Sequence, residues 1–568
     1  MNDRTISRRN FLAAGALSAG FLLARTGRAS TSLAFSAAAG SADATPAARA
    51  AAKACRGQAG AILSIPFGEY HFADPPAIRD MENLLAAGKS RDLAWGGNND
   101  PFQLAFDFID CDDLIFDGNG STLVFHGLIA PFSFRNCRSV TLKNFTLDWD
   151  RPLFTTGYVE RVKSLGPLSY ADFQPAVGFP LSGGEPAFAW QAFDPVTLDF
   201  SALEAYFPMP PLKKVDGGLF RLAHPLAARL KKGDGLMVRH VGMFRPGIHL
   251  FESESIRIED VTMRANPGIG VIGHRSRDIA ISRLTVAPRP GRVMTCNTDA
   301  LHFISCRGQV TVEDSSCRGM GDDGINVHNF YQVVKQRIND RTLLLTVPAA
   351  TQDCMFDHPD AGDRLEICRR DTLVGYAEVA VESAEPSQEQ WEVTVRLDRP
   401  LPADFRPTDI FANVSQLPRL TYRGNRVGAN RARAVLCQTR GALIENNEFI
   451  RCTGTGVHVN TAAGMPRSWW ESAGTRDVVI RGNRIIGCGS GPGCYHGASG
   501  VTVGAESIRE DAGVHRNLTI ESNEIECAAK RSGIYLSAVT GVRLTGNKIT
   551  GGEPAIVVRK SVVGIQRD

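Results

Sequence analysis

The chain has 568 residues, too many for one compact globule, so several domains or an elongated repeat are expected. Its 63 basic and 60 acidic residues leave a net charge of +3, which gives no electrostatic reason to expect nucleic acid as a partner. The 56 glycines suit a solenoid of short β-strands, because every coil of a solenoid must turn several corners.

The N-terminus resembles a twin-arginine export signal. Ser7 to Leu12 (SRRNFL) precedes an apolar run from Ala13 to Ala24, which is too short to span a bilayer as a permanent helix. Small residues from Ala37 to Ala39 offer a cleavage site. We therefore expect residues 1–39 to be a signal peptide and leader, with no membrane anchor and a periplasmic or secreted mature protein. The alternative is a chance arginine pair before a buried helix.

Thirteen cysteines in an exported chain raise the question of disulfides. Several of them fall at matching points of the repeats described below, and stacked free cysteines behave as small apolar residues. Buried thiols are therefore favoured over a disulfide framework. No pair has C-x-x-C spacing, which argues against zinc. The cysteines at matching points are Cys137, Cys306, Cys317, Cys452 and Cys488.

Residues 40–151 are expected to form the first coils of a β-helix. The stretch from Ala61 to Phe72 reads as strand, turn and strand, and Leu114 to Phe125 repeats this order around a Gly/Asn turn. Alternation over Val140 to Phe145, with apolar residues inward and Thr or Lys outward, is typical of a half-buried strand.

The coil pattern breaks twice. Residues 152–242 hold Pro-rich loops and a strand near Gly235 to Arg239, and we interpret them as an inserted β-barrel. Coils resume over residues 243–330, which carry the acidic residues discussed below. Residues 331–415 are predicted to be a second inserted β-barrel, because the runs Thr342 to Val347 and Trp391 to Leu397 are typical of strands.

Residues 416–568 carry the plainest repeat, in which Asn is followed by a polar and then an apolar residue. Asn tolerates left-handed corners, and its side chain can hydrogen-bond the backbone of the next coil. The repeat predicts an all-β fold, a right-handed parallel β-helix with two inserted small β-barrels. The repeated residues are Asn425, Asn447, Asn483, Asn523 and Asn547.

Three carboxylates stand out in the central coils, where Asp322 and Asp323 follow Asp299 after one coil. Since neighbouring strands lie about 4.8 Å apart, we expect Asp299 to lie about 5–8 Å from the other two. Gly321 and Gly324 permit a bend that turns both neighbouring aspartates outward.

Such a trio has three interpretations. It can be a solvated turn cluster, because Gly-Asp-Asp-Gly is good turn chemistry. It can be a calcium site, as in pectate-lyase-type β-helices. It can be an acid/base pair for glycoside hydrolysis, since an inverting enzyme separates its carboxyls by roughly 6.5–9.5 Å and nearby like charges raise one pKa. Spacing alone leaves hydrolase and calcium-dependent lyase open.

The motif Asn297-Thr298-Asp299, followed one coil later by Asp322-Asp323, resembles the polygalacturonases of glycoside hydrolase family 28, whose Gly-His-Gly and Arg-x-Lys motifs have no counterpart here. A closer resemblance, along most of the mature chain, is to glycoside hydrolase family 110, the inverting, exo-acting α-1,3-galactosidases. The motifs that carry it are Gly118–Ser121, Phe125–Gly127, Gly268–Gly273, Asp299–Phe303, Asp322–His328 and Trp469–Ser472.

The resemblance implies a β-helix interrupted by two β-barrels and the release of terminal α-1,3-linked galactose with inversion, without metal or other cofactor. It implies Asp322 as the general acid and Asp299 and Asp323 as the general base. The implied partner is a glycan with terminal α-galactose, and a homodimer is left open. The alternatives are a polygalacturonase-like hydrolase or calcium-dependent lyase on acidic polysaccharide, and a non-catalytic glycan-binding β-helix.

Several neighbours of the trio are candidates for binding the sugar. Histidines can hydrogen-bond hydroxyls, an arginine can orient a carboxylate or hydroxyl, and a tryptophan face suits the apolar side of galactose. The alternatives are histidines satisfied at corners and tryptophans that cap the solenoid. The candidates are His274, Arg292, His302, Asn326, His328, Trp470 and Glu471.

Overall fold

The structure, a computed structural model, describes residues 31–88, 103–348, 357–387, 391–466, 468–491, 498–528 and 530–568. Residues 1–30, which carry the predicted export motif, lie outside this part. Within it, no helix is long and apolar enough to cross a membrane. The strand Thr31–Ala34 pairs in parallel with Ala61–Ser64, so the end of the predicted leader belongs to the first coil.

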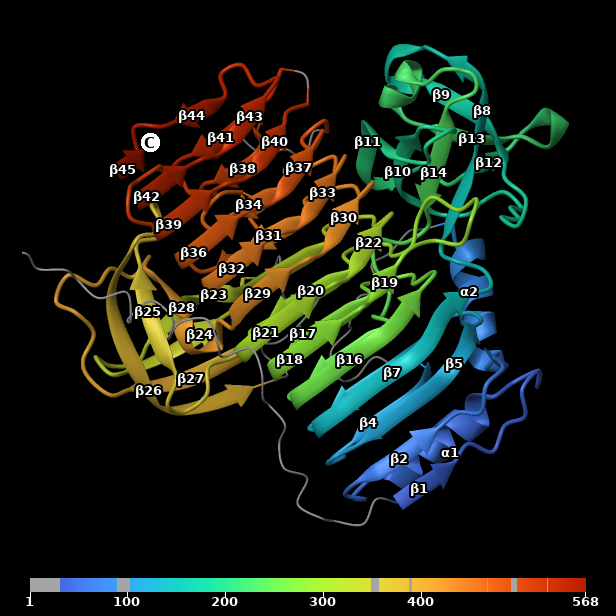
Figure 1. The fold of residues 1–568 in the computed structure, drawn as a ribbon, viewed down its shortest axis with the longest axis horizontal. Coiled ribbons are helices and arrows are strands. Elements are labelled where there is room, and N and C mark those ends of the chain that lie inside the picture. The colour runs from blue at the N-terminus through green and yellow to red at the C-terminus, as the bar shows by residue number, and fades with distance from the viewer. Residues whose placement is uncertain are drawn as a thin grey trace, which may run out of the picture.

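The body of the molecule is a parallel β-helix (Figure 1). Its larger sheet has 21 strands, and most coils contribute two of them, separated by a corner. The strands of this sheet are β1 (Thr31–Ala34), β2 (Ala61–Ser64), β3 (Glu69–Phe72), β5 (Ile115–Phe125), β7 (Arg138–Trp149), β16 (Glu254–Met263), β18 (Arg277–Ser282), β19 (Thr285–Val286), β21 (Arg307–Glu313), β22 (Ser316–Arg318), β29 (Arg419–Arg423), β30 (Arg426–Gly428), β32 (Arg440–Glu445), β33 (Glu448–Ile450), β36 (Arg476–Arg481), β37 (Arg484–Ile486), β39 (His515–Glu521), β40 (Glu524–Glu526), β42 (Val539–Thr545), β43 (Lys548–Thr550) and β45 (Val562–Arg567).

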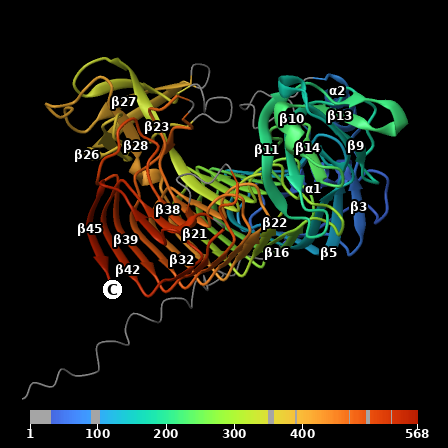
Figure 2. The same ribbon diagram turned by 90° about the horizontal axis from the view of Figure 1, so that it is seen from above.

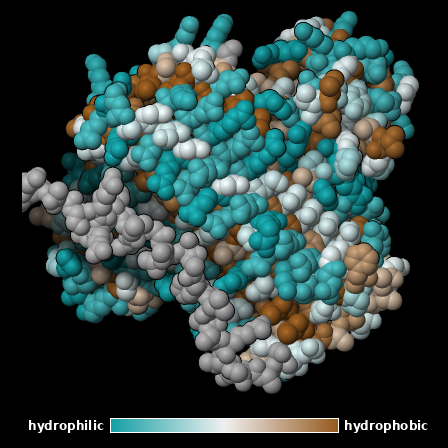
Figure 3. Space-filling model, viewed as in Figure 1, coloured by the Kyte–Doolittle hydropathy of each residue, from teal (hydrophilic) through white to brown (hydrophobic). Residues whose placement is uncertain are grey.

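A second parallel sheet closes the other side of each coil, and it carries the site described below. Its strands are β4 (Gln103–Ile109), β6 (Ile129–Arg135), β15 (Ile248–Phe251), β17 (Val271–His274), β20 (Leu301–Ile304), β23 (Ile325–Arg337), β31 (Val435–Cys437), β34 (Val457–Val459), β38 (Ala498–Val503), β41 (Ser532–Leu536) and β44 (Ile556–Val558). The first sheet faces the viewer of Figure 3, where its surface is mainly hydrophilic, as expected for strands that bury only one side.

The core between the sheets is built by stacking like residues on successive coils. Phe106 stacks on Phe132 with ring centroids 4.9 Å apart, and Phe108 stacks on Phe134 at 4.8 Å, close to the spacing of the coils. At the N-terminal end, helix α1 (Thr45–Cys55) buries its alanines against the same core, whereas α2 (Pro75–Ala86) packs in a separate apolar cluster. The eleven described cysteines are free thiols, which confirms for them the preference for thiols.

The asparagine repeat forms a hydrogen-bonded ladder inside one corner. The Asn447 side chain accepts a bond from the Asn425 backbone N–H at 2.9 Å, and the Asn483 side chain accepts from Asn447 at 3.0 Å. The series continues through Asn523 to Asn547. Each amide also donates to a backbone carbonyl of the preceding coil, so this polar corner is satisfied without water.

The first insertion is a seven-stranded antiparallel sheet with an apolar core of its own. In hydrogen-bonding order its strands are β11 (Phe200–Met209), β10 (Ala187–Phe193), β14 (Gly235–Arg239), β8 (Phe154–Lys163), β9 (Tyr170–Pro175), β13 (Phe220–Ala223) and β12 (Lys213–Lys214).

The second insertion closes into an antiparallel barrel, as predicted. The long strand β23 leaves the β-helix and enters it, followed by β24 (Thr342–Thr346), β25 (Arg364–Cys368), β26 (Gly375–Ser387), β27 (Glu392–Leu397) and β28 (Ile410–Asn413). Figure 2 shows both insertions rising from the same side of the β-helix.

Candidate active site

The three predicted aspartates meet at the beginning of two neighbouring strands of the second sheet. Asp299 lies just before β20, and Asp322 and Asp323 lie just before β23, with Leu301 of β20 paired to Ile325 of β23. Gly321 and Gly324 flank the pair for reasons of space. A Cβ on Gly321 would lie 2.1 Å from the Asn297 carbonyl oxygen, and one on Gly324 would lie 2.5 Å from that of Ala434. The glycines therefore let the coils approach.

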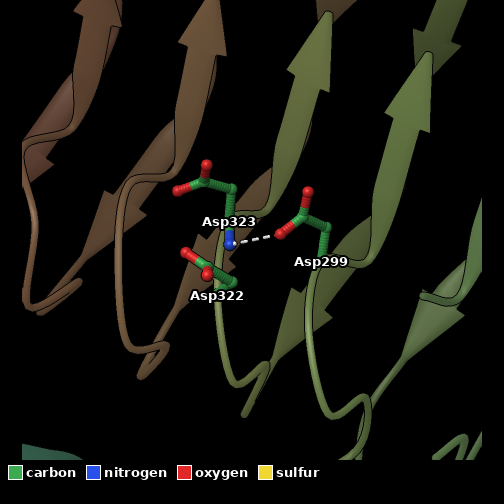
Figure 4. A group of neighbouring side chains, drawn as sticks. All are labelled: Asp299, Asp322 and Asp323. Atoms are coloured by element: carbon green, nitrogen blue, oxygen red, sulfur yellow. Dashed lines mark hydrogen bonds between the residues drawn. The ribbon is translucent and has the colours of Figure 1, made fainter. Parts of the chain in front are cut away.

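The carboxylates are packed more tightly than the sequence indicated. The backbone N–H of Asp323 donates to Asp299 Oδ1 at 3.0 Å (Figure 4). One carboxylate oxygen from each aspartate lies within 4.8 Å of one from each of the others, below the expected range. The Asp322 side chain is 23% exposed, whereas those of Asp299 and Asp323 are 7% and 2% exposed. Asp322 is thus the carboxylate most accessible to a substrate.

Two arginines that the sequence analysis missed pair with the aspartates. Arg431 Nη1 lies 3.2 Å from Asp322 Oδ2, and Arg433 Nη2 lies 2.8 Å from Asp323 Oδ2. The Arg433 backbone N–H also donates to Asp323 Oδ1 at 2.7 Å. Arg433 stands two residues before β31, the same place that Asp323 has before β23. Aligning the predicted strands β23 and β31 and comparing the residues two positions before each would have revealed Arg433.

Burial and mutual repulsion keep protons on this cluster. Burial raises the pKa of Asp299 well above its ordinary range, and the negative charge of Asp322 adds to the effect. Burial also raises the pKa of Asp323, although the Arg433 guanidinium opposes it. Carboxyls so close do not ionise independently, so the trio titrates as one coupled group. Carboxyls whose surroundings push their pKa values apart are what acid/base catalysis requires.

Two histidines support the trio from the side of β20 and β23. His302 Nδ1 lies 2.7 Å from Asp299 Oδ2, and His302 Nε2 lies 2.8 Å from His328 Nε2. Burial lowers the pKa of His302 to about 4 and also lowers that of His328, so both imidazoles are neutral at neutral pH. These two predicted residues are therefore brought to the site.

Glu471 and Asn326 complete the wall on the side of the later coils. Gln438 Nε2 donates to Glu471 Oε2 at 2.5 Å and to Asn326 Oδ1 at 3.4 Å. Glu471 Oε1 also lies 3.8 Å from His328 Nε2. On the same wall, Asn460 Nδ2 donates to Glu506 Oε1 at 2.9 Å. Gln438 and Glu506 were missed, because segments remote in sequence bring them here.

Three predicted binding residues make other contacts and are not seen beside the trio. His274 is buried and lies 3.9 Å from Asp357, near the second barrel. Arg292 donates to the backbone carbonyls of Trp149 and Asp150 at 3.3 Å each. Trp470 is only 8% exposed and packs in an apolar cluster with Arg370 5.1 Å over its ring, so its faces are covered.

The surroundings of the trio are rich in carboxylates. Glu204, Glu471 and Glu506 join the three aspartates, and the guanidiniums that interact with them include Arg431, Arg433 and, through Glu204, Arg239. The three aspartates are close enough to hold a metal ion, yet two of them already face a guanidinium that compensates their charge. The geometry favours a site for neutral, hydroxyl-rich molecules over one for anions.

Fold and site together define a parallel β-helix protein with a buried carboxylate centre between two inserted β-domains. The family described as a right-handed beta helix region matches residues 410–565.

Among individual proteins, the chain is similar to alpha-1,3-galactosidases. It is 24% identical to Alpha-1,3-galactosidase A of Bacteroides fragilis over 89% of this chain and 85% of that protein. It is 27% identical to Alpha-1,3-galactosidase B of Bacteroides thetaiotaomicron over 78% of this chain and 72% of that protein. A solved family 28 exopolygalacturonase of Yersinia enterocolitica aligns over 95% of this chain and 78% of its own, with 11% identity and a TM-score of 0.36. The similarity to the two galactosidases confirms the resemblance to α-1,3-galactosidases drawn from the motifs.

Proposed function

We propose that the chain is an exo-acting, inverting glycoside hydrolase that releases terminal α-1,3-linked galactose. The observation that carries the proposal is the trio itself, in which one accessible carboxyl adjoins two buried carboxyls, with oxygens of all three within 4.8 Å of one another. The names of the similar proteins, alpha-1,3-galactosidases, supply the sugar and the linkage.

In this mechanism Asp322 donates its proton to the glycosidic oxygen as the bond from C1 to that oxygen breaks. A water molecule attacks C1 from the opposite face and gives its proton to Asp299 or Asp323. The products are the free sugar and an alcohol, and the site is reset when Asp322 takes a proton from solvent and the base releases its proton to solvent. Exposure supports this assignment, because the acid must reach the leaving group whereas the base needs only the water.

Inversion rests on the motif resemblance and on the availability of two deeper carboxylates to activate water. Oxygens within 4.8 Å of one another do not select inversion by themselves, since retaining enzymes separate their two carboxyls by only about 5 Å. The stereochemistry of the product therefore decides this part of the proposal.

Exo action rests on the motif resemblance, and a buried apolar cluster lies on one side of the trio. Ile272 lies next to His302 on the preceding coil, at the same register. It packs with Ile269, Ile304, Phe330 and Val347, and Met243 adjoins them.

The charges around the trio weigh against an acidic polysaccharide. A uronate would bring its own carboxylate among six others, which outnumber the guanidiniums of Arg239, Arg431 and Arg433, and like charges repel strongly where water is excluded. A calcium-dependent lyase would also need the cation to displace Arg431 and Arg433 from the aspartates. The neutral sugar is the better fit.

The test is proton NMR of an α-1,3-galactosyl disaccharide incubated with the purified protein and a chelator, beside an Asp322→Asn variant. Initial β-galactose with a silent variant is the expected result. Initial α-galactose would replace inversion by retention. Release that chelator abolishes, or an unsaturated product absorbing in the ultraviolet, would favour the metal-dependent alternative.

We also propose that the protein is exported by the twin-arginine route, on the motif from Ser7 to Leu12. Cell fractionation of the full chain and of a variant with Lys at positions 8 and 9 tests this. The wild type is expected in the periplasm or medium and the variant in the cytoplasm. Equal distribution would refute the route.

A further inference from the structure

The first insertion contributes side chains to the catalytic centre through its strand β11. Glu204 Oε1 accepts a bond from Arg431 Nη2 at 3.2 Å, and Glu204 Oε2 lies 3.2 Å from Arg431 Nε. The same guanidinium contacts Asp322, so Arg431 lies between a carboxylate of the β-helix and one of the insertion. The Tyr206 ring, also on β11, lies 4.3 Å from Arg431 Cζ.

The inserted sheet is held in this position by further ionic contacts with the coils. Asp199, next to β11, accepts bonds from Arg318 at 3.0 Å and from Arg451 at 2.6 Å. Arg239 at the end of β14 donates to the backbone carbonyl of Gly321 at 3.2 Å. Gly321 directly precedes Asp322, so the insertion contacts the turn that carries Asp322 as well as Arg431.

This arrangement answers an electrostatic problem. A general acid must carry a proton, but a guanidinium 3.2 Å away favours the ionised carboxylate. Glu204 supplies the compensating negative charge on the other side of Arg431. Its side chain is only 8% exposed, so solvent screens it weakly. The other charged or titratable groups around Asp322 are Asp299, Asp323, Arg433 and His302.

We propose that Glu204 is a positioning residue for the proposed reaction: by neutralising and orienting Arg431, it lets Asp322 hold the proton that it donates to the leaving group. The first insertion then helps to keep the general acid protonated, in addition to lining the site. The inference rests on the proposed function, because only a general acid needs this protection.

The experiment measures kcat/KM against pH for the α-1,3-galactosyl disaccharide with four full-length proteins. They are the wild type, Glu204→Gln, the double variant Glu204→Gln/Arg431→Gln and the control Glu160→Gln. Glu160 also pairs with a cation on the inserted sheet, Lys232 at 3.0 Å, but its side chain is 41% exposed. Each protein is also assayed with an aryl galactoside whose leaving group is good enough to depart unprotonated.

In Glu204→Gln, the uncompensated Arg431 should move the alkaline limb of the profile down by about one pH unit. The double variant should move the limb back toward the wild-type position, because both charges are gone. The aryl galactoside should lose less than threefold in Glu204→Gln, and Glu160→Gln should match the wild type.

A limb that stays in place in Glu204→Gln, or equal losses on both substrates, would overturn the inference while leaving the hydrolase standing. Folding failure is recognised by the aryl assay and by circular dichroism, and Glu204→Met, which also removes the charge, then replaces the Gln variant with the same expected direction. A wild type that hydrolyses neither substrate would remove the proposed function and this inference together.

Discussion

The backbone N–H of Asp323 donates to the Asp299 carboxylate at 3.0 Å, joining two successive coils through a side chain of the aspartate trio. A hydrogen bond from a backbone amide fixes the carboxylate more firmly than a bond from a mobile side chain would. Asp299 also lies 2.7 Å from the neutral imidazole of His302. The coil spacing thus sets the position of the Asp299 carboxylate. Because few positively charged groups surround it, the carboxyl ionises less readily than in water.

The first prediction is that Asp299→Asn stabilises the protein at neutral pH while abolishing activity. Burial raises the pKa of Asp299 above the ordinary 3.8, so the folded state binds its proton more tightly than the unfolded state does. Stability is therefore complete below the ordinary value and falls as pH rises through the raised pKa. Asn carries no charge and keeps the acceptor for the Asp323 N–H.

Calorimetry at pH 4 and pH 8 tests this prediction. The variant should exceed the wild type by about 1–3 kcal/mol at pH 8 and by little at pH 4. Asp340→Asn, an exposed aspartate of the second barrel, serves as the control and should change stability at neither pH. A variant that is less stable at both pH values would show that the carboxylate is needed for packing.

The second prediction concerns Asp322→Asn. Asn occupies the same volume but has no proton to donate, so kcat on the disaccharide should fall about 10²–10⁴-fold. A substrate with a good leaving group should lose far less, because its departure needs no acid. Steady-state kinetics on both substrates measures the difference. Equal losses would mean that Asp322 acts as a base or only binds, and its role would pass to another member of the trio.

The sequence predicted the trio because coil length and strand register are local properties of the chain. It missed Glu204 because no local pattern encodes how an inserted sheet docks onto a β-helix. It selected Trp470 over Trp469 because adjacent tryptophans look alike in a motif. In the structure Trp470 adopts a left-handed φ of 61° and is buried, while Trp469 is 55% exposed. Tertiary packing decides which of two neighbouring tryptophans is exposed, and neither composition nor periodicity contains that information.

The third prediction concerns the thiols. Burial raises the pKa of Cys55 and Cys437 to about 11 and that of Cys306 to about 12, so thiolates are scarce at pH 8. Ten of the eleven described cysteines are buried, and Cys527 is partly exposed. Among these eleven, a thiol reagent should therefore label Cys527 first and the buried thiols only after denaturation.

Titration of the free thiols in guanidinium without reductant, followed by mass spectrometry of the labelled peptides, checks this prediction. At least eleven free thiols are expected, matching the free cysteines of the structure, and reductant should leave the melting temperature unchanged. A count below eleven, or a drop in melting temperature on reduction, would establish disulfides among residues that the structure shows as thiols.

The last prediction concerns the asparagine ladder. Asn483 donates to the Ile444 carbonyl at 2.9 Å and accepts from the Asn447 backbone at 3.0 Å, with its side chain buried. Asn483→Ala leaves these groups without partners in a corner closed to water, which should cost about 2–4 kcal/mol of unfolding free energy. Glu526→Ala, at an exposed position of the same C-terminal coils, should change stability by less than about 0.5 kcal/mol. Urea denaturation of both variants measures the difference. A ladder variant as stable as the control would mean that water replaces the asparagine and that stacking of apolar residues alone holds the C-terminal coils together.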